Sequence, residues 1–274
     1  MRPLTSQIPR EFAQRLGRET LSIGEKGIYK TPSGHTIDLR EEIARSVRGT
    51  RSYSPDLLLK DALNGEHTTI IEITNETTLS AATRLLQRRL NTVVLNFASA
   101  TSPGGGFLVG ARAQEEYLAR SSCLYQCICD NPMYAFHRSH YDPFYSDTIL
   151  YSPEVPVIRD DDGALLEEPY TVSIITSPAV NASKVPPERR KDISPVMWRR
   201  ILKVLGVGAA HDHDGIVLGA WGCGAFGNDG SVISGLFCKA LKSNFRGVFR
   251  HVVFAIVDWS PERKFIQPFE DAFG

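Results

Sequence analysis

The sequence predicts an α/β fold in which a mixed, largely parallel β-sheet is flanked by helices. Short apolar segments rich in Val and Ile alternate with longer segments whose apolar residues recur every three to four positions. Two of these apolar segments run directly into glycine-rich loops, and each loop is followed by a new helical segment. Alternating strands and helices of this kind are typical of parallel sheets that are covered on both faces.

The composition is that of an ordinary globular protein, with 42% hydrophobic and 23% charged residues in a chain of 274, which is enough for a large core. The 31 Lys and Arg residues balance the 31 Asp and Glu residues, which argues against a protein that coats nucleic acid by long-range attraction. The N-terminal residues lack the apolar core of a signal peptide, and no apolar run approaches the roughly 18 residues of a membrane span. The five cysteines are odd in number and lack CxxC spacing, which favours a reducing compartment, by default the cytoplasm.

The first part of the chain predicts an accessory layer without chemistry of its own. Residues 9–26 place apolar side chains near one face and predict a helix that packs on the main body. Residues 27–30 and 35–39 flank the turn-forming sequence Thr-Pro-Ser-Gly and predict a β-hairpin. Residues 40–48 predict a second helix, so we expect residues 1–64 to form an N-terminal helical and hairpin extension.

Residues 65–274 are expected to form the core that carries the chemistry, with the extension packed on it in one compact unit. The predicted strands occupy residues 68–74, 93–98, 172–176, 216–221 and 252–257. The predicted helices occupy residues 78–89, about 114–137, 194–206 and 232–241. Residues 140–170 are rich in aromatic residues and proline and predict irregular structure, with short β segments around a turn at 160–163. Ser194 followed by Pro195 predicts a helix N-cap with proline at the first helical position.

Both glycine-rich loops are candidates for binding an anion. Gly104, Gly105 and Gly106 follow the strand at 93–98, and the loop at 222–227 follows the strand at 216–221. Glycines can take positive φ, so several amide NH groups can point at one phosphate with no side chain in the way. Ligands of parallel sheets bind at the carboxyl ends of the strands, where both loops fall. The alternative for each loop is a tight turn or close packing of strand against helix.

Glu115 and Glu116 start the helix that follows the first loop. Neighbouring residues on a helix point about 100° apart, so the two carboxylates cannot flank one bond as the paired acids of glycosidases do. At most one of them transfers a proton directly. The alternative is that both acids stabilise the helix start, where negative charge is favourable.

Four other groups of residues have structural explanations. Residues 211–214, His-Asp-His-Asp, predict a solvated turn rather than a metal site because no third ligand is near in the sequence. Cys123 and Cys127 predict buried packing. Three cationic runs are predicted to lie on solvent-exposed faces of the protein: Arg88-Arg89, Arg189-Arg190-Lys191 and Arg199-Arg200. For Phe226, stacking on a base or ribose and packing in the protein remain alternatives.

The sequence PGGGFLVGARAQEE at residues 103–116 resembles the signature of the bacterial-type poly(ADP-ribose) glycohydrolases, a three-glycine run followed by Gln-Glu-Glu. The resemblance extends to residues 96–100, 175–181 and 219–228, and covers most of the chain from about residue 65 onward. It implies a macrodomain-like core.

The resemblance also implies roles for the matched residues. Glu116 is implied as the catalytic acid and base, Glu115 as a hydrogen-bond partner of substrate ribose hydroxyls, and Gln114 as a residue that helps to fix the loop. Asn96 is implied beside the distal ribose, whereas the adenine pocket matches only loosely, to the strand that ends at Thr74. The residues implied to bind the diphosphate or to order the distal ribose are Gly104, Gly105, Gly106, Gly222, Gly224, Ala225, Phe226 and Gly227.

The implied activity is hydrolysis of the 1″–2′ ribose–ribose bond of poly(ADP-ribose), mainly from the chain end and leaving the last protein-linked unit. Neither a cofactor nor a metal is expected. The implied partners are poly(ADP-ribose), ADP-ribose and ADP-ribosylated proteins, bound by a monomer without direct contact to nucleic acid or membrane.

Two other function classes remain as alternatives. A non-hydrolytic ADP-ribose reader would need the loops but not the glutamates. A dinucleotide-dependent oxidoreductase is suggested by Gly222, Gly224 and Gly227, which spell GxGxxG, but this motif alone is weak and too few strands follow it. A P-loop NTPase is disfavoured because no GK[ST] follows either loop.

Overall fold

The computed structural model describes residues 8–57 and 63–274. The helices are α1 (Arg10–Lys26), α2 (Arg40–Gly49), α3 (Thr78–Gln87), α4 (Gln114–Ser121), α5 (Leu124–Ile128), α6 (Pro132–Ser139), α7 (Ile193–Ala210), α8 (Gly230–Lys239) and α9 (Gln267–Phe273). The strands are β1 (Ile28–Lys30), β2 (Thr36–Asp38), β3 (Arg51–Tyr53), β4 (Ile70–Thr74), β5 (Thr92–Phe97), β6 (Ile149–Arg159), β7 (Leu165–Ser177), β8 (Gly215–Leu218) and β9 (His251–Ala255). Short helical turns lie at η1 (Phe107–Val109), η2 (Ala182–Lys184), η3 (Pro187–Asp192) and η4 (Ala240–Asn244).

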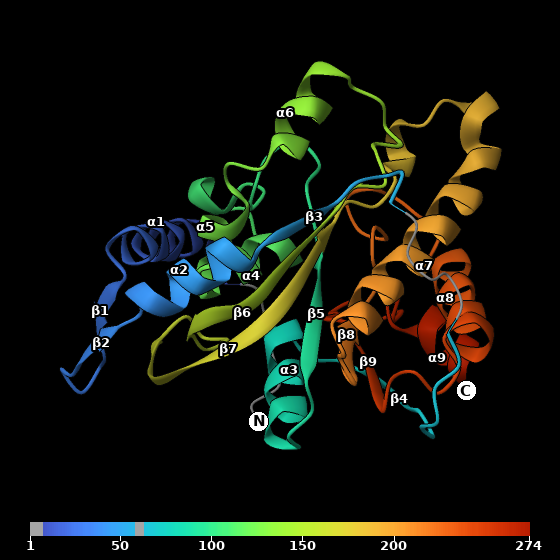
Figure 1. Ribbon diagram of the computed structural model, residues 1–274. Helices are drawn as coiled ribbons and strands as arrows, with labels where there is room; N and C mark the ends of the chain where they lie inside the picture. The colour runs from blue at the N-terminus through green and yellow to red at the C-terminus, as the bar shows by residue number, and fades with distance from the viewer. Residues whose placement is uncertain (1–7, 58–62) are drawn as a thin grey trace.

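Across the described ranges, the main sheet has seven strands in the order β3-β6-β7-β5-β8-β9-β4. The pairings from β7 through β5, β8 and β9 to β4 are parallel, and β3–β6 and β6–β7 are antiparallel. The prediction of a mixed, largely parallel sheet flanked by helices is therefore confirmed (Figure 1). None of the helices among the described residues is long and apolar enough to cross a membrane.

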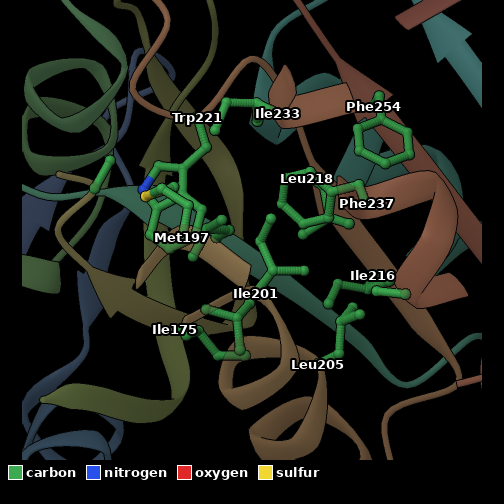
Figure 2. Close-up of a cluster of buried hydrophobic side chains, with 14 of the residues drawn as sticks. Ile175, Met197, Ile201, Leu205, Ile216, Leu218, Trp221, Ile233, Phe237 and Phe254 are labelled. Carbon is green, nitrogen blue, oxygen red and sulfur yellow. The ribbon is translucent and has the colours of Figure 1, made fainter. Parts of the chain in front are cut away.

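The central strands bury both of their faces, because successive side chains point to opposite sides of a sheet. On β8, Ile216 and Leu218 belong to one hydrophobic cluster, whereas Val217 between them belongs to the other. The first cluster joins the sheet to α7, α8 and α9, and includes Trp221 and Phe254 (Figure 2). The second joins it to α3, α4, α5 and α6. Near-continuous apolar runs in the sequence are thus explained by helices on both faces.

The N-terminal segment contains the predicted helices and hairpin, with β1 and β2 paired antiparallel around residues 31–35. Helix α1 lies against α4, and Thr20 Oγ1 on α1 donates to the Arg120 carbonyl oxygen at 2.6 Å. The buried Arg159 side chain at the end of β6 donates to Thr20 Oγ1 at 3.0 Å and pairs with Glu19 at 2.7 Å. The segment therefore supports the helix that begins with the two glutamates.

The prediction of one long helix after the first glycine loop is wrong, because the chain forms α4, α5 and α6 in succession. At the end of α4, Ser122 forms a β-bridge with Val157, and the Cys123 NH donates to the Pro156 carbonyl oxygen at 2.9 Å. These bonds to β6 replace the next helical hydrogen bonds. Helix α6 then starts at Pro132, with the Asn131 side chain accepting from the Met133 NH at 3.0 Å.

The prediction of irregular structure over residues 140–170 is wrong for its second half, where β6 and β7 form a long antiparallel pair. The predicted turn at 160–163 joins them, with Gly163 at φ +88°. Pro153 and Pro156 obscured the strand, since proline removes a ladder donor. Strand β3 pairs only with residues 149–151 of β6, so both prolines lie beyond that ladder. Pro153 falls in the irregularity between Ser152 and Val155, and Pro156 contributes its carbonyl oxygen, which accepts from the Cys123 NH.

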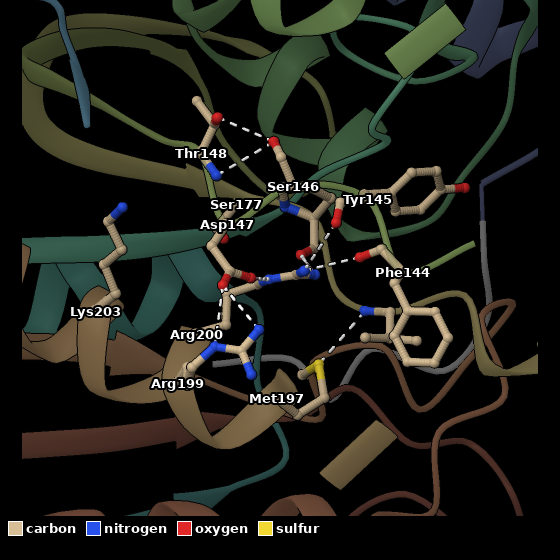
Figure 3. Close-up of polar contacts among 12 residues, drawn as sticks. Phe144, Tyr145, Ser146, Asp147, Thr148, Ser177, Met197, Arg199, Arg200 and Lys203 are labelled. Carbon is tan, nitrogen blue, oxygen red and sulfur yellow. Dashed lines mark hydrogen bonds and ion pairs between the residues drawn. The ribbon is translucent and has the colours of Figure 1, made fainter. Parts of the chain in front are cut away.

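The predicted N-cap at Ser194 is also wrong: α7 starts at Ile193, and its cap residue Asp192 makes no side-chain capping bond. Arg200 on α7 was expected to be solvated, but its side chain is fully buried and pairs with Asp147 at 2.8 Å (Figure 3). It also donates to the Pro178 carbonyl oxygen at 2.8 Å.

Residues 211–214 do not form a fully solvated turn, because His213 is buried. Its Nδ1 donates to the Asn91 carbonyl oxygen at 3.2 Å, so its Nε2 accepts from the Tyr151 hydroxyl at 2.9 Å. Burial is the main cause that lowers the pKa of His213 to about 4, which keeps the ring neutral at pH 7. The histidine is thus a satisfied core residue.

Candidate active site

The two glycine-rich loops meet at one edge of the sheet, because β5 and β8 are parallel neighbours and a loop follows the carboxyl end of each. A cavity of about 470 Å³ opens at this edge. Its walls come from the start of α4, from the second loop and from the segments that follow β4 and β9. The position agrees with the rule that ligands bind at the carboxyl ends of parallel strands.

Gln114 fixes the start of α4 against the sheet. Its side-chain Oε1 accepts from the Phe97 NH at 2.9 Å, and its Nε2 donates to the Leu95 carbonyl oxygen at 2.8 Å and to Thr78 Oγ1 at 3.1 Å. The hydrogen bonds of this side-chain amide therefore all go to β5 and α3. These bonds set the positions of the two glutamates that follow in the helix.

Glu115 is 3% exposed, and both of its oxygens contact protein donors. Oε2 accepts from the Ser99 NH at 2.6 Å, and Oε1 lies 3.5 Å from Asn96 Nδ2. Asn96 is fully buried and also donates to Thr176 Oγ1 at 3.2 Å. Burial is the largest cause that raises the pKa of Glu115 to about 8, and the neighbouring charge of Glu116 adds to it, whereas the Ser99 NH opposes it.

Glu116 is 9% exposed and differs from Glu115 in having one uncommitted oxygen. Its Oε1 accepts from the Gly106 NH at 2.9 Å. Its Oε2 is buried without a hydrogen-bond partner in the described part of the chain, and the residue lines the cavity. Unpaired buried polar atoms are costly, so such an atom in a cavity wall indicates a place for a ligand. The two adjacent glutamates thus have different surroundings, as the helix geometry predicts.

The first loop places glycine where a side chain would strike the glutamates. Gly104 and Gly105 have φ of +69° and +59°, and a Cβ on Gly105 would overlap Glu116 Oε1 and lie 3.0 Å from Glu115 Oε2. Two backbone NH groups of the loop already have acceptors within the protein. The Gly105 NH donates to the Ser102 carbonyl oxygen at 2.9 Å, and the Gly106 NH donates to Glu116. The loop therefore holds the carboxylates in place.

The second loop forms the opposite wall, to which Gly222, Gly224, Ala225 and Phe226 contribute. Gly222 and Gly227 have φ of +76° and +69°, and a Cβ on Gly222 would lie 2.6 Å from the Ala179 Cβ. The half-buried Phe226 lines the cavity and also packs against the core. The two alternatives predicted for Phe226 were contact with a ligand and packing in the protein, and its position allows both.

Arg120 was not predicted as a site residue, but it lines the cavity one helical turn after Glu116. It is 7% exposed, its guanidinium lies 5.5 Å from the centre of the Tyr117 ring, and its Nη1 has no hydrogen-bond partner among residues 8–57 and 63–274. Residues four apart on a helix share a face, so the spacing from Glu116 was the available signal. An unpaired buried cation in the wall suits an anionic ligand.

Asp161 was predicted to be only part of a turn, but it fastens that turn to the cavity wall. Its carboxylate accepts from the hydroxyls of Thr77, Ser80 and Tyr117, with Thr77 at 2.9 Å and Ser80 at 2.8 Å. At the far end of the cavity, the sequence indicated only the strand that ends at Thr74, and Trp259 was missed. Parallel β4 and β9 are neighbours there, and Trp259 follows β9.

The raised pKa of Glu115 predicts a pH-dependent effect of Glu115→Gln on stability. The folded-state pKa of about 8 exceeds the ordinary value of 4.5, so the folded protein binds more protons than the unfolded chain between these values. Wild-type stability therefore falls as pH rises through this window, by up to about 5 kcal/mol for this group. Glutamine carries no charge, so the melting temperature of Glu115→Gln relative to wild type is expected to rise from pH 5 to pH 9. Glu25→Gln, an exposed change on α1, is the control, and a difference that stays constant with pH would contradict the prediction.

Comparisons with known proteins point to one family. A family model described as microbial-type PARG, catalytic domain, matches residues 17–160. The poly(ADP-ribose) glycohydrolase (PARG) structure from Thermomonospora curvata is 46% identical with a TM-score of 0.92, and the match covers 96% of this chain and 100% of that one. A second T. curvata structure, bound to the inhibitor ADP-HPD, is 45% identical with a TM-score of 0.91, over 96% of this chain and 100% of that chain. The PARG of Deinococcus radiodurans in complex with ADP-ribose is 39% identical with a TM-score of 0.80, over 86% of this chain and 98% of that chain. A comparison with curated proteins found no match.

Proposed function

The chain belongs to the microbial-type poly(ADP-ribose) glycohydrolases, and we propose that it hydrolyses the 1″–2′ ribose–ribose bond of poly(ADP-ribose) and releases ADP-ribose, mainly from the chain end. The observation that carries the proposal is the pair of buried glutamates with unequal partners in the wall of a cavity that the second glycine loop also lines. Gly104, Gly105 and Gly106 lie behind the glutamates and do not line this cavity. Burial raises the pKa of Glu115 to about 8, so this site holds a proton at neutral pH. A glycosidic bond needs such a proton for its leaving oxygen.

Glu116 is proposed as the acid and base. Its Oε1 is anchored by the Gly106 NH, and its Oε2 has no partner in the described part of the chain, so this oxygen is available to the scissile bond. The protonated carboxyl donates to the 2′ oxygen that leaves, positive charge develops at C1″, and the resulting carboxylate removes a proton from the attacking water. Glu115 is proposed to hold substrate ribose hydroxyls, since Ser99 and Asn96 keep its carboxyl group in one position.

The remaining candidate residues are proposed to hold ADP-ribose. Asn96 supports the distal ribose through Glu115, Phe226 packs on this ribose, and Gln114 fixes the helix start. Arg120 adds a cation for the substrate's negative charge. The residues proposed beside the diphosphate are Gly104, Gly105, Gly106, Gly222, Gly224, Ala225 and Gly227.

The setting of the reaction is part of the proposal. The polymer is carried by ADP-ribosylated proteins, and the enzyme acts as a monomer, without direct contact to nucleic acid or membrane. All five cysteines lie within the described residues and are free thiols, which supports a reducing compartment such as the cytoplasm.

Product release from purified poly(ADP-ribose) tests the proposed activity. ADP-ribose is expected to accumulate as the polymer shortens from its end. Binding of ADP-ribose without product release would instead make the protein a reader. A change in nicotinamide fluorescence on mixing the protein with NADH would favour the oxidoreductase alternative.

A further inference from the structure

A row of aromatic rings leads from the cavity to the outer surface, and we call it the aromatic strip. It starts with Phe226 and Tyr145 and divides at Tyr145. Tyr141 packs on Tyr145 in one branch, and in the other the buried His137 leads from Tyr145 to Phe136 and His140. Tyr145 lies 6.2 Å from Phe226, measured between ring centroids, and 6.4 Å from Tyr141. The strip is therefore continuous with the residue proposed to pack on the distal ribose.

The outer part of the strip is open to solvent. Tyr141 is 61% exposed and Phe136 is 49% exposed. Phe136 stacks on the exposed His140, with ring centroids 4.7 Å apart and planes inclined by 19°. Clustered exposed rings mark an interaction surface more often than scattered ones do.

The inner part of the strip is held firmly by the buried Arg200. Its Nη2 donates to the Phe144 carbonyl oxygen at 2.7 Å and lies 3.5 Å from that of Tyr145. Tyr145 has φ of +55°, an unfavourable conformation for this residue that the surrounding bonds maintain. In Figure 3 the Tyr145 ring points away from Arg200. The backbone is thus constrained in a way that presents the ring outward.

Cations border the strip. Arg138 on α6 is exposed and donates to the Thr101 carbonyl oxygen at 2.8 Å, beside the first glycine loop. Lys184 is exposed next to Ser183, whose NH donates to the Phe226 carbonyl oxygen at 2.9 Å. Neither cation forms a salt bridge with a described residue. A ligand that alternates flat rings with negative charge would match this surface.

We propose that the aromatic strip binds the part of the poly(ADP-ribose) chain beyond the bond being cleaved. Each unit of this polymer carries one adenine and a diphosphate, so adenines stack on Tyr141 and on Phe136 while Arg138 and Lys184 face phosphates. Aromatic platforms with nearby cations hold single-stranded nucleic acids in the same manner. The inference rests on the proposed function, because it extends the path of that substrate.

The test compares long poly(ADP-ribose) with a dimer of ADP-ribose, which has one unit beyond the bond. In the double variant Phe136→Ala/Tyr141→Ala, the ratio of KM for long chains to KM for the dimer is expected to rise about tenfold, as loss of base stacking predicts. Phe136→Tyr/Tyr141→Phe keeps both rings and is expected to keep the wild-type ratio. Val232→Ala removes an exposed apolar side chain on α8 and serves as the matched control.

The outcomes separate this inference from the proposed function. Wild-type protein that hydrolyses neither substrate would overturn the proposed function. If wild-type protein hydrolyses both, and the alanine double variant has the same KM ratio as Val232→Ala, then only the proposal that the aromatic strip binds the polymer would be overturned. Thermal unfolding at the wild-type temperature shows that the double variant is folded, as expected for changes at exposed side chains.

Discussion

Glu116→Gln is expected to lower the rate of ADP-ribose release about 10²- to 10⁴-fold, the usual contribution of a general acid and base. Glutamine has nearly the same shape and can still accept from the Gly106 NH, which holds Glu116 at 2.9 Å. It cannot supply a proton of suitable acidity to the leaving oxygen or remove one from water. Affinity for ADP-ribose is therefore expected to remain close to the wild-type value.

Steady-state assays on poly(ADP-ribose) and calorimetric titration with ADP-ribose measure the two parts of this prediction. Glu25→Gln makes the same chemical change at an exposed position on α1 and is expected to leave both values unchanged. Near-normal turnover in Glu116→Gln would remove this residue from the mechanism. Loss of both turnover and binding would assign it to substrate binding.

The sheet was predictable wherever a strand is buried on both faces. The strands around Val94 and Val217 are short apolar runs between helices, and this local pattern determines their structure. The β6–β7 pair was not predictable in the same way, because its prolines are tolerated only since β3 ends before them and since Pro156 needs to supply only its carbonyl oxygen, to the Cys123 NH. That information lies in the tertiary arrangement and not in the segment itself.

The same distinction applies to side chains. The opposed surroundings of Glu115 and Glu116 follow from the helical period, which local sequence contains. Arg200 looked like a surface residue beside Arg199, because a pair of arginines on a helix is usually solvated. Its burial depends on Asp147, which lies 53 positions away in the sequence and neutralises its charge. The ion pair with Asp147 compensates for the lost hydration of the Arg200 guanidinium only once α7 has packed on the segment that carries Asp147.

The first loop offers the sharpest test of whether the glutamates must be held where they are. A Cβ on Gly105 would overlap Glu116 Oε1 and approach Glu116 Cδ to 2.9 Å, so both carboxylates would have to move in Gly105→Ala. Misplacement of a catalytic group by about 1 Å can cost about 100-fold in rate, and turnover is expected to fall by at least this factor. The φ of +59° adds a conformational penalty of about 1–2 kcal/mol for alanine, which predicts a lower melting temperature.

Gly235→Ala in α8 is the matched control for this change. The added Cβ would have no heavy atom within 4 Å, and alanine favours a helix over glycine by up to about 1 kcal/mol, so activity is expected to persist and stability to rise. A folded Gly105→Ala protein with wild-type turnover would show that the loop tolerates displaced carboxylates. If instead turnover is lost while the protein stays folded, the need for glycine at this position is mechanistic. The bare backbone at Gly105 then serves to let two carboxyls approach the loop, in addition to any contact it makes with phosphate.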